Sequence, residues 1–294
     1  GDKLLNFVNN TLFPVLKGND VKEGDTVIYE GIKVTPDTPI KKAIVKSTFE
    51  DANNYMKDGV YLRQVIDVID EIEFDDVKES HAFGFVYEEI LRELQSAGSS
   101  GEFYTPRAVT EFMALMIKPK LGEKMADFAC GTGGFITSWL KELAPSIQNT
   151  DDQVSYANSI YGIEKKQFPY ILCITNMLLH DLDDPQVFHN NALTRDLLDY
   201  TEEDQFDVIL MNPPYGERLS QDKNVLRLYQ DIGTALKHQF SGATAWMISS
   251  NEEALKCVGL RPAKRIHLVN GDLDCLFNQY VLFKGDRKSW KKSL

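Results

Sequence analysis

Short apolar runs alternate with helical patterns in the second half of the chain. The runs that predict strands cover residues 125–129, 159–164, 206–211 and 243–250, and helical patterns begin near Phe135 and Pro169. Such alternation predicts a parallel, doubly wound α/β sheet. The C-terminal end differs, because residues 265–269 and 274–283 flank an Asn270-Gly271 turn and predict an antiparallel β-hairpin.

The first part of the chain has a different pattern. An amphipathic helix is predicted for residues 1–17, and the loop-rich stretch 18–40 contains a short strand at 26–29. Apolar positions recur at helical spacing from Pro39 to about Asp70 and again over 83–94, before the SAGSSG segment at 96–101. We therefore expect a small, mainly helical N-terminal domain over 1–95 and an α/β domain over 96–294.

The charge of the chain restricts its partners. Among 294 residues there are 32 Lys and Arg against 44 Asp and Glu, a net charge of −12. Because phosphate neutralisation requires Lys and Arg, such a chain is a poor non-specific nucleic-acid binder. Residues 225–294 are the exception, with eleven Lys or Arg against six Asp or Glu. Nucleic-acid contacts are therefore expected in this C-terminal part or from a basic partner subunit.

The cellular location follows from what the sequence lacks. No run of eighteen apolar residues and no signal-peptide pattern occur, so neither a membrane span nor secretion is expected. The four cysteines are scattered, without CxxC spacing or a nearby histidine pair. This pattern argues against a zinc site and favours a reducing, cytoplasmic location, and no metal is expected.

A glycine-rich loop follows the first apolar run of the α/β part. It runs from Asp127 to the start of a helix and contains Gly131, Thr132, Gly133 and Gly134. Glycines there allow a tight turn and a close ligand approach to helix N–H groups. The spacing is neither GxGxxG nor a P-loop, so a cofactor other than a dinucleotide is expected, and a turn that binds nothing is the alternative. Some thirty residues on, Glu164 ends a strand, where it could accept ribose hydroxyls or simply be solvated.

A second motif, Asn212-Pro213-Pro214-Tyr215, ends the strand predicted at 206–211. Two prolines stiffen the backbone and remove donors, which leaves carbonyls exposed. Asn212 Oδ1 and the Pro213 carbonyl can accept the two hydrogens of an exocyclic amine while the Tyr215 ring stacks on a planar base. A proline-stiffened turn with a core tyrosine is the alternative.

A third segment, GEFYTPR at 101–107, precedes a predicted helix. Thr105 suits the N-cap position and Pro106 the first helical position, so capping alone would explain both. The functional interpretation is an aromatic and hydroxyl wall beside a cofactor.

Together these motifs resemble the modification (methyltransferase) subunit of type I restriction-modification systems, over about residues 1–216. The similarity extends to LLNFVNNTLFPVLKG, YLRQVIDVIDEI and YGIEKKQFPYILCITNMLLHDL. The resemblance implies the S-adenosylmethionine-dependent methyltransferase fold, a parallel sheet closed by an antiparallel hairpin. It implies S-adenosyl-L-methionine as cofactor, contacted by Glu102, Phe103, Tyr104, Thr105, Pro106, Arg107, Asp127, Gly131, Thr132, Gly133, Gly134, Glu164 and Asn191. Phe128 departs from the pattern, because the family usually has proline there.

The resemblance changes at the Asn-Pro-Pro-Tyr motif. From about residue 213 the chain is similar to the ribosomal-RNA guanine 2-amino methyltransferase family, through NPPYGERL, the SSNEE segment and the LRP…K…NG-L-C pattern. The chain therefore looks like a mosaic. The later segment carries Arg261, Lys264 and Arg265, which could contact RNA phosphates.

The resemblance to the type I subunit implies a DNA adenine-N6 methyltransferase. The catalytic residues would be Asn212, Pro213, Pro214 and Tyr215, acting on a flipped adenine without a general base of unusual pKa. DNA would be reached through a specificity subunit docked on 1–95, in a hetero-oligomer that also holds restriction subunits. An RNA guanine 2-amino methyltransferase and an inactive interaction subunit are the alternatives.

Overall fold

A computed structural model describes residues 1–35, 38, 40–71, 105–180, 182, 184–194, 205–215 and 222–283. The chain divides into two compact units, one of Gly1–Leu91 with Leu178–Asp184 and one of Arg92–Met177 with Pro185–Leu294. The helix predicted over 83–94, the break at 96–101 and the boundary between residues 95 and 96 lie outside the described residues. Within the described ranges, no helix has the length and apolar character needed to cross a bilayer.

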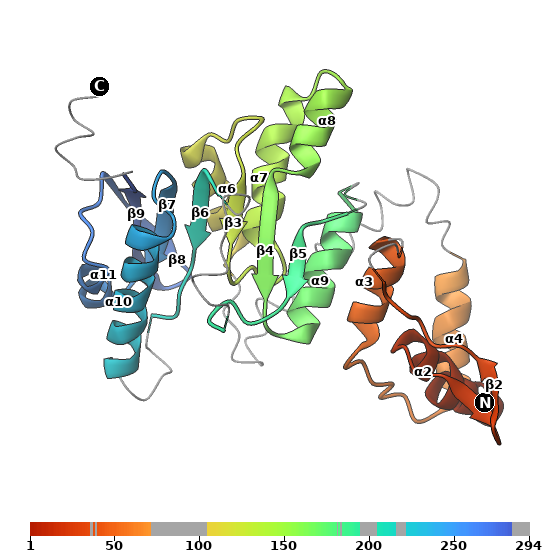
Figure 1. Ribbon diagram of the computed structural model, residues 1–294. Helices are drawn as coiled ribbons and strands as arrows, with labels where there is room; N and C mark the ends of the chain where they lie inside the picture. Colours follow the sequence, from red (N-terminus) through yellow and green to blue (C-terminus); the bar gives the residue numbers. More distant parts are fainter. Residues whose placement is uncertain are drawn as a thin grey trace. The chain divides into compact units, whose positions relative to one another are not determined.

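The first unit is mainly helical, as predicted (Figure 1). Its helical elements are α1 (Asp2–Phe7), a π-helical segment (Val8–Leu12), α2 (Phe13–Leu16), α3 (Ile40–Phe49) and α4 (Gly59–Asp70). The helical pattern from Pro39 to Asp70 thus forms two helices, and Asp58 caps the second by accepting a hydrogen bond from Val60 N at 2.7 Å. The predicted strand at 26–29 is β2 (Thr26–Tyr29), and it pairs with β1 (Val21–Glu23), which the sequence pattern did not predict.

The second unit is built on one seven-stranded sheet in the order β5-β4-β3-β6-β7-β9-β8. The strands are β3 (Met125–Asp127), β4 (Ile160–Glu164), β5 (Val187–His189), β6 (Val208–Met211), β7 (Thr244–Ser249), β8 (Lys264–Asn270) and β9 (Leu273–Val281). Strands β3 to β7 are parallel, and β9 runs antiparallel between β7 and β8. The predicted fold class, a mostly parallel sheet closed by an antiparallel hairpin, is confirmed.

Helices cover the strands of this sheet (Figure 1). They are α6 (Arg107–Ile117), α7 (Gly134–Leu143), α8 (Thr150–Ala157), α9 (Gln167–Leu178), α10 (Asp222–His238) and α11 (Glu252–Cys257). One apolar cluster joins Tyr229 and Leu236 of α10 and Leu255 of α11 to Ile209 and Met247 of the sheet. Since β3 is buried throughout and β6 nearly so, the central strands read as continuous apolar runs.

The β8–β9 hairpin turns one residue later than predicted. Asn270 pairs with Leu273, so Gly271 and Asp272 form the two-residue loop instead of Asn270 and Gly271. Gly271 has φ +64°, a value that glycine adopts freely and other residues rarely do. Asn270 consequently stays in the strand, which matters for the site described below.

The strand order places the functional motifs. The chain lays down β3, β4 and β5 toward one edge of the sheet and then returns to the other side of β3 with β6 and β7. Such a reversal opens a crevice at the carboxyl ends of the two central strands, where ligands bind in open α/β sheets. Asp127 is the last residue of β3, and Asn212 directly follows β6.

A test of this packing is Gly233→Ala in α10. A Cβ at Gly233 would lie 2.0 Å from the carbonyl oxygen of Val258, which follows α11, so the two helices would have to separate. We expect the free energy of unfolding to fall by about 1–3 kcal/mol or more, measured by urea denaturation. The neighbouring exposed variant Thr234→Ala should change it by less than about 0.5 kcal/mol. Equal stabilities for the two variants would contradict this packing.

Candidate functional site

The loop between β3 and α7 is held in one conformation by its glycines and its neighbours. Gly131 and Gly133 have φ +56° and +81°, and Gly133 is the N-cap of α7. A Cβ at Gly133 would lie 2.8 Å from Sγ of Cys173. Cys130 N donates to the carbonyl of Ile163 in β4 at 3.0 Å. Gly133 therefore cannot take a side chain without a shift of the loop or of Cys173, and the positive φ of Gly131 disfavours one there, as expected for a ligand cradle.

A small pocket, partly open to solvent, lies beside this loop. Its walls are Thr105, Thr110, Asp127, Ala129, Cys130, Gly131, Thr132, Gly134, Phe135 and Asn212. Six of these were predicted site residues, and the pocket brings the glycine loop and the Asn-Pro-Pro-Tyr motif together. Thr110, Ala129, Cys130 and Phe135 were not predicted, although each stands within five residues of a motif that was.

Among the described residues, Asp127 has a buried carboxylate oxygen without a hydrogen-bond partner. Its Oδ1 accepts a hydrogen bond from Ala129 N at 3.1 Å, whereas its buried Oδ2 has no partner. The pKa of Asp127 is raised to about 7, mainly by burial; the Ala129 hydrogen bond acts to lower this pKa and the nearby Glu164 carboxylate acts to raise it. An unpartnered acceptor lining a pocket fits a ligand that brings a donor or a positive charge.

Glu164 ends β4, as predicted, and its carboxylate bonds two backbone N–H groups. Its Oε2 accepts from Gly131 N at 2.9 Å and its Oε1 from Lys166 N at 2.7 Å, so it fixes the glycine loop. Each carboxylate oxygen keeps a second lone pair, so a ribose contact stays a prediction. Asn191 follows β5 and forms a local turn, with Oδ1 accepting from Leu193 N at 3.1 Å. Neither residue is among those that line the pocket.

The segment before α6 corrects one interpretation. Helix α6 begins at Arg107 with Pro106 in the N-cap position, one residue later than the sequence suggested. Thr105 is therefore not the cap, and its hydroxyl accepts a hydrogen bond from Nδ2 of Asn212 at 2.6 Å. Thr105 thus faces the Asn-Pro-Pro-Tyr motif, 107 residues away in sequence. Glu102, Phe103 and Tyr104 lie outside the described residues.

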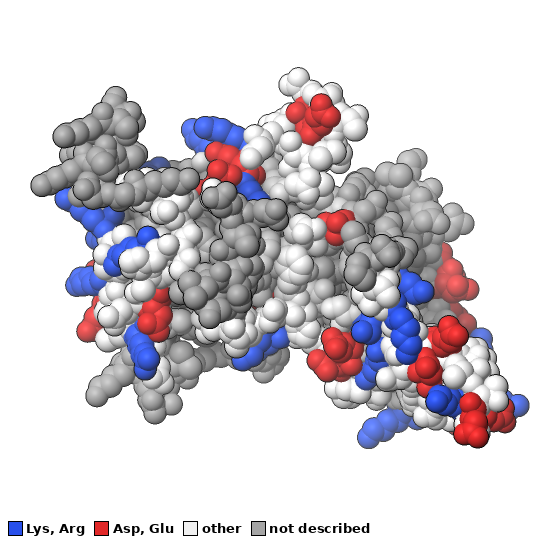
Figure 2. Space-filling view, viewed as in Figure 1, with Lys and Arg blue, Asp and Glu red and all other residues white. Residues whose placement is uncertain are grey.

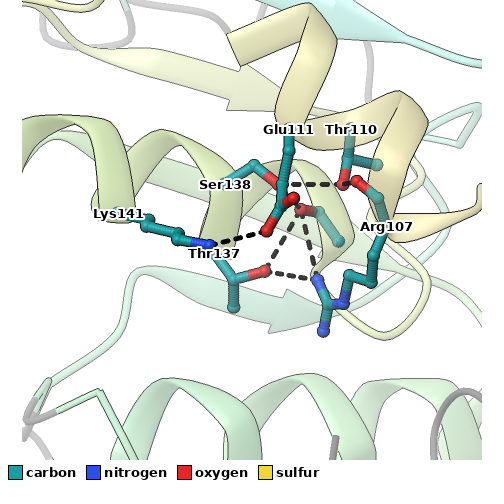
Figure 3. Close-up of polar contacts among 7 residues, drawn as sticks. Arg107, Thr110, Glu111, Thr137, Ser138 and Lys141 are labelled. Atoms are coloured by element: carbon teal, nitrogen blue, oxygen red, sulfur yellow. Dashed lines mark hydrogen bonds and ion pairs between the residues drawn. The ribbon is translucent and has the colours of Figure 1, made fainter. Parts of the chain in front are cut away.

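Arg107 braces the glycine loop from the helix side (Figure 3). Its Nη1 donates to the Gly134 carbonyl at 3.3 Å and to the hydroxyl of Thr137. Further contacts between α6 and α7 join Ser138 to Thr110 and Lys141 to Glu111, at 2.8 and 2.7 Å. The structure therefore gives Arg107 a supporting position behind the loop, and it is not among the residues that line the pocket.

The first and last side chains of the Asn-Pro-Pro-Tyr motif are hydrogen-bonded to each other. Asn212 Oδ1, the atom expected to accept the amine of a base, accepts the hydroxyl of Tyr215 at 2.6 Å. Burial raises the pKa of Tyr215, so the hydroxyl stays protonated and able to donate. Asn270 Nδ2 donates to the same hydroxyl at 3.4 Å, and Asn251 Nδ2 donates to the Tyr215 carbonyl at 2.8 Å.

Asn251 and Asn270 were not predicted as site residues. The SSNEE segment shows Asn251 only as a helix cap, and the Asn-Gly pair shows Asn270 only as a turn residue. Neither local pattern points to Tyr215, because both contacts depend on how the C-terminal strands pack beside β6.

The fold and the motifs together define the class of the S-adenosylmethionine-dependent methyltransferase fold: a parallel sheet closed by an antiparallel hairpin, a glycine loop after β3 and Asn-Pro-Pro-Tyr after β6. The model of the N-6 DNA methylase family matches residues 78–256, more than half of the chain. The chain belongs to the N-6 DNA methylase family. The expected cofactor, S-adenosyl-L-methionine, is that of this family.

Individual relatives fit both resemblances. The methylase subunit of the type I restriction enzyme EcoEI of Escherichia coli is 48% identical over 218 residues, covering 74% of this chain and 41% of that protein. Ribosomal RNA large subunit methyltransferase K/L of Aliivibrio salmonicida (strain LFI1238) is 45% identical over 75 residues, covering 26% of this chain and 11% of that protein. Both predicted resemblances are therefore confirmed.

A solved structure supports the fold over almost the whole chain. That structure concerns complex assembly and conformational transition of the type I restriction-modification system. Its TM-score is 0.74 at 25% identity, and the match covers 96% of this chain and 60% of that one. The chain thus spans less than two thirds of the length of these relatives.

The raised pKa of Asp127 predicts a pH dependence of stability. An unfolded aspartate has a pKa near 3.8 and the folded Asp127 has one near 7, so between these pH values the Asp127 carboxyl group is ionised mainly in the unfolded chain. The free energy of unfolding should therefore fall as pH rises through this window, by at most about 4 kcal/mol from this group. Asp127→Asn cannot ionise and should lack this contribution.

The measurement compares urea unfolding of the two proteins at pH 5 and pH 8. The stability of the Asn variant relative to the unaltered chain should be higher at pH 8 than at pH 5. The contributions of the other titrating groups are the same in both proteins and cancel. A stability difference that is the same at both pH values would contradict the assignment of a raised pKa to Asp127.

Proposed function

We propose that the chain is the modification subunit of a type I restriction-modification system, a site-specific DNA adenine-N6 methyltransferase. It would transfer a methyl group from S-adenosyl-L-methionine to the 6-amino group of a flipped adenine. The observation that carries this proposal is the shared pocket, in which the side chain of Asn212 and the glycine loop line the same space. Membership of the N-6 DNA methylase family supports the same reaction.

The cofactor pocket has features that fit S-adenosyl-L-methionine. Its residues would be Asp127, Gly131, Thr132 and Gly134, with Glu164 and Arg107 holding the loop from outside. The unpartnered Oδ2 of Asp127 supplies the acceptor that a cationic, hydrogen-bond-donating ligand requires. When bound, S-adenosyl-L-methionine supplies a methyl group on a positively charged sulfur.

Asn212 and Pro213 would hold the reacting amine. Thr105 accepts from Asn212 Nδ2, which leaves Oδ1 as the atom that faces a hydrogen-bond donor. An amine that donates one hydrogen to Asn212 Oδ1 and the other to the Pro213 carbonyl has its lone pair free for attack. Since positioning supplies much of the rate in such a reaction, no strong base is needed.

Tyr215 would have two positions in this mechanism. In the structure its hydroxyl occupies Asn212 Oδ1, the acceptor that the amine needs. A base that enters must take over this hydrogen bond, which releases the ring to stack on the base. In this exchange Asn212 Oδ1 keeps a hydrogen bond, because the amine replaces the hydroxyl as donor, whereas the Tyr215 hydroxyl gives up its acceptor.

We propose that specificity and restriction subunits complete the assembly and that DNA is reached through the specificity subunit. The EcoEI relative is itself named a subunit, and the chain carries −12 net charge. Residues 1–95 are the proposed docking domain. Its helix α4 exposes Val60, Tyr61, Val65 and Val68, apolar side chains that a protein partner could cover.

Charge on the second unit gives limited support to an RNA substrate, the second candidate. On the face seen in Figure 2, basic and acidic side chains are interspersed over α10 and α11. The described residues from 225 to 283 hold six Lys or Arg against five Asp or Glu, so most of the C-terminal excess falls after residue 283. The similarity to ribosomal RNA methyltransferase K/L is what favours this candidate. A cytoplasmic location, proposed for either substrate, agrees with the four free cysteines.

Asn212→Ala tests the proposed role of the amide. It removes one of two acceptors for the amine, so we expect kcat to fall by about a hundredfold or more. The dissociation constant of S-adenosyl-L-methionine, measured by calorimetry, should change less than about threefold, because Asn212 is only one of ten pocket residues. A variant with unaltered kcat would sink the mechanism. Absence of cofactor binding by the folded, unaltered chain would favour an inactive interaction subunit.

The product identifies the substrate. The full chain, assembled with the proposed specificity subunit, is incubated with methyl-labelled S-adenosyl-L-methionine and either unmethylated DNA or ribosomal RNA, and the nucleic acids are digested to nucleosides. We expect labelled 6-methyladenine from DNA, with the Asn212→Ala variant as the blank. Labelled 2-methylguanosine from RNA without 6-methyladenine would replace the DNA proposal by the RNA candidate and leave the cofactor site unchanged.

A further inference from the structure

Asn251 joins three elements around the Asn-Pro-Pro-Tyr motif. Its Oδ1 caps α11 by accepting from Ala254 N at 2.9 Å, and its Nδ2 donates to the Tyr215 carbonyl at 2.8 Å. Its own N–H donates to Ser249 Oγ at the end of β7 at 3.1 Å, and that hydroxyl also bonds Tyr229 of α10 at 2.7 Å. The amide cannot be flipped, since one side faces an N–H donor and the other a carbonyl acceptor.

The catalytic loop needs such an external donor. Pro213 and Pro214 have no N–H, so this stretch of backbone cannot tie itself to its neighbours by donating hydrogen bonds. Its first carbonyl after the prolines belongs to Tyr215, and this is the atom that Asn251 holds. The anchor lies on the backbone and leaves the Tyr215 side chain free to change its position.

From these contacts we propose that Asn251 is a positioning residue for methyl transfer: it holds the backbone of Tyr215 while the Tyr215 side chain exchanges its bond to Asn212 for the incoming base. The inference rests on the proposed function for the reaction itself. It also assigns a task to the segment that resembles the ribosomal-RNA methyltransferases, because Asn251 and Asn270 from that segment both hold Tyr215.

The decisive variant is Asn251→Ser. Serine caps a helix as well as asparagine does, but it is too short to reach the Tyr215 carbonyl. Asn251→Asp keeps the shape and the cap and replaces the donor by an acceptor that faces the carbonyl. The matched control is Asn149→Ser, because Asn149 caps α8 in the same way, accepting from Asp152 N at 3.0 Å, and is outside the site.

In the methylation assay with unmethylated DNA, we expect kcat to fall about tenfold to a hundredfold in both Asn251 variants. KM for DNA and the dissociation constant of S-adenosylhomocysteine should stay within about threefold, and Asn149→Ser should match the unaltered chain. Unaltered kcat in both Asn251 variants would overturn the proposal, as would a loss that simply follows the melting temperature and appears equally in Asn149→Ser.

Hydrogen exchange tests the anchor without activity. In a peptide covering residues 206–215, Asn212 and Tyr215 are the amides beyond β6, since the prolines have none. Asn251→Ser should accelerate their exchange at least about fivefold, and Asn149→Ser should not. If the unaltered chain, assembled with the specificity subunit, transfers no methyl group to DNA or RNA, the proposed function fails, and the exchange rates alone decide the anchor: unchanged rates overturn it and faster rates support it.

Discussion

Strands β3 and β6 are parallel neighbours near the centre of the sheet. From β3 the chain adds β4 and β5 on one side, and it then returns to place β6 and β7 on the other side of β3. The adjacent carboxyl ends of β3 and β6 bring Asp127 and Asn212 to one pocket, although 84 residues separate them in the chain. Every other feature of the site follows this arrangement. The glycine loop needs the opening that the reversal creates, and α6 and α7 brace that loop through Arg107.

The polar groups of the site are connected in one chain of hydrogen bonds. Thr105 accepts from Asn212, Asn212 accepts from Tyr215, and Tyr215 is held further by Asn251 and Asn270. Such a network fixes the orientation of the Asn212 amide before any substrate arrives, which is the preorganisation that a reaction driven by positioning requires. At the same time, the Tyr215 hydroxyl satisfies an acceptor that would otherwise face the pocket unpaired.

The two resemblances of the chain meet in this network. The pocket residues from 105 to 135 belong to the part similar to the type I methylase subunit, whereas Asn251 and Asn270 belong to the part similar to the ribosomal RNA methyltransferases. The shared Asn-Pro-Pro-Tyr motif lies between them. A mosaic of this kind can hold one site together because both parts supply strands of the same sheet in the standard order.

The sequence by itself determined the alternation of helices with the central strands, the C-terminal hairpin, the glycine loop and the Asn-Pro-Pro-Tyr motif, because each depends on residues close together in the chain; it did not predict the short strands β1 and β5. Apolar runs mark buried strands, and glycine and proline restrict the backbone wherever they stand. Only the tertiary structure decided that Thr105 bonds Asn212 instead of capping α6, that Glu164 bonds the glycine loop, and that Asn251 and Asn270 hold Tyr215. From the sequence alone, each of these polar side chains could be satisfied by a nearby residue, but the partners named here lie 33 to 107 residues away. Packing brings those partners within hydrogen-bonding distance. Because burial excludes water, a buried polar atom then bonds to the protein group that lies beside it.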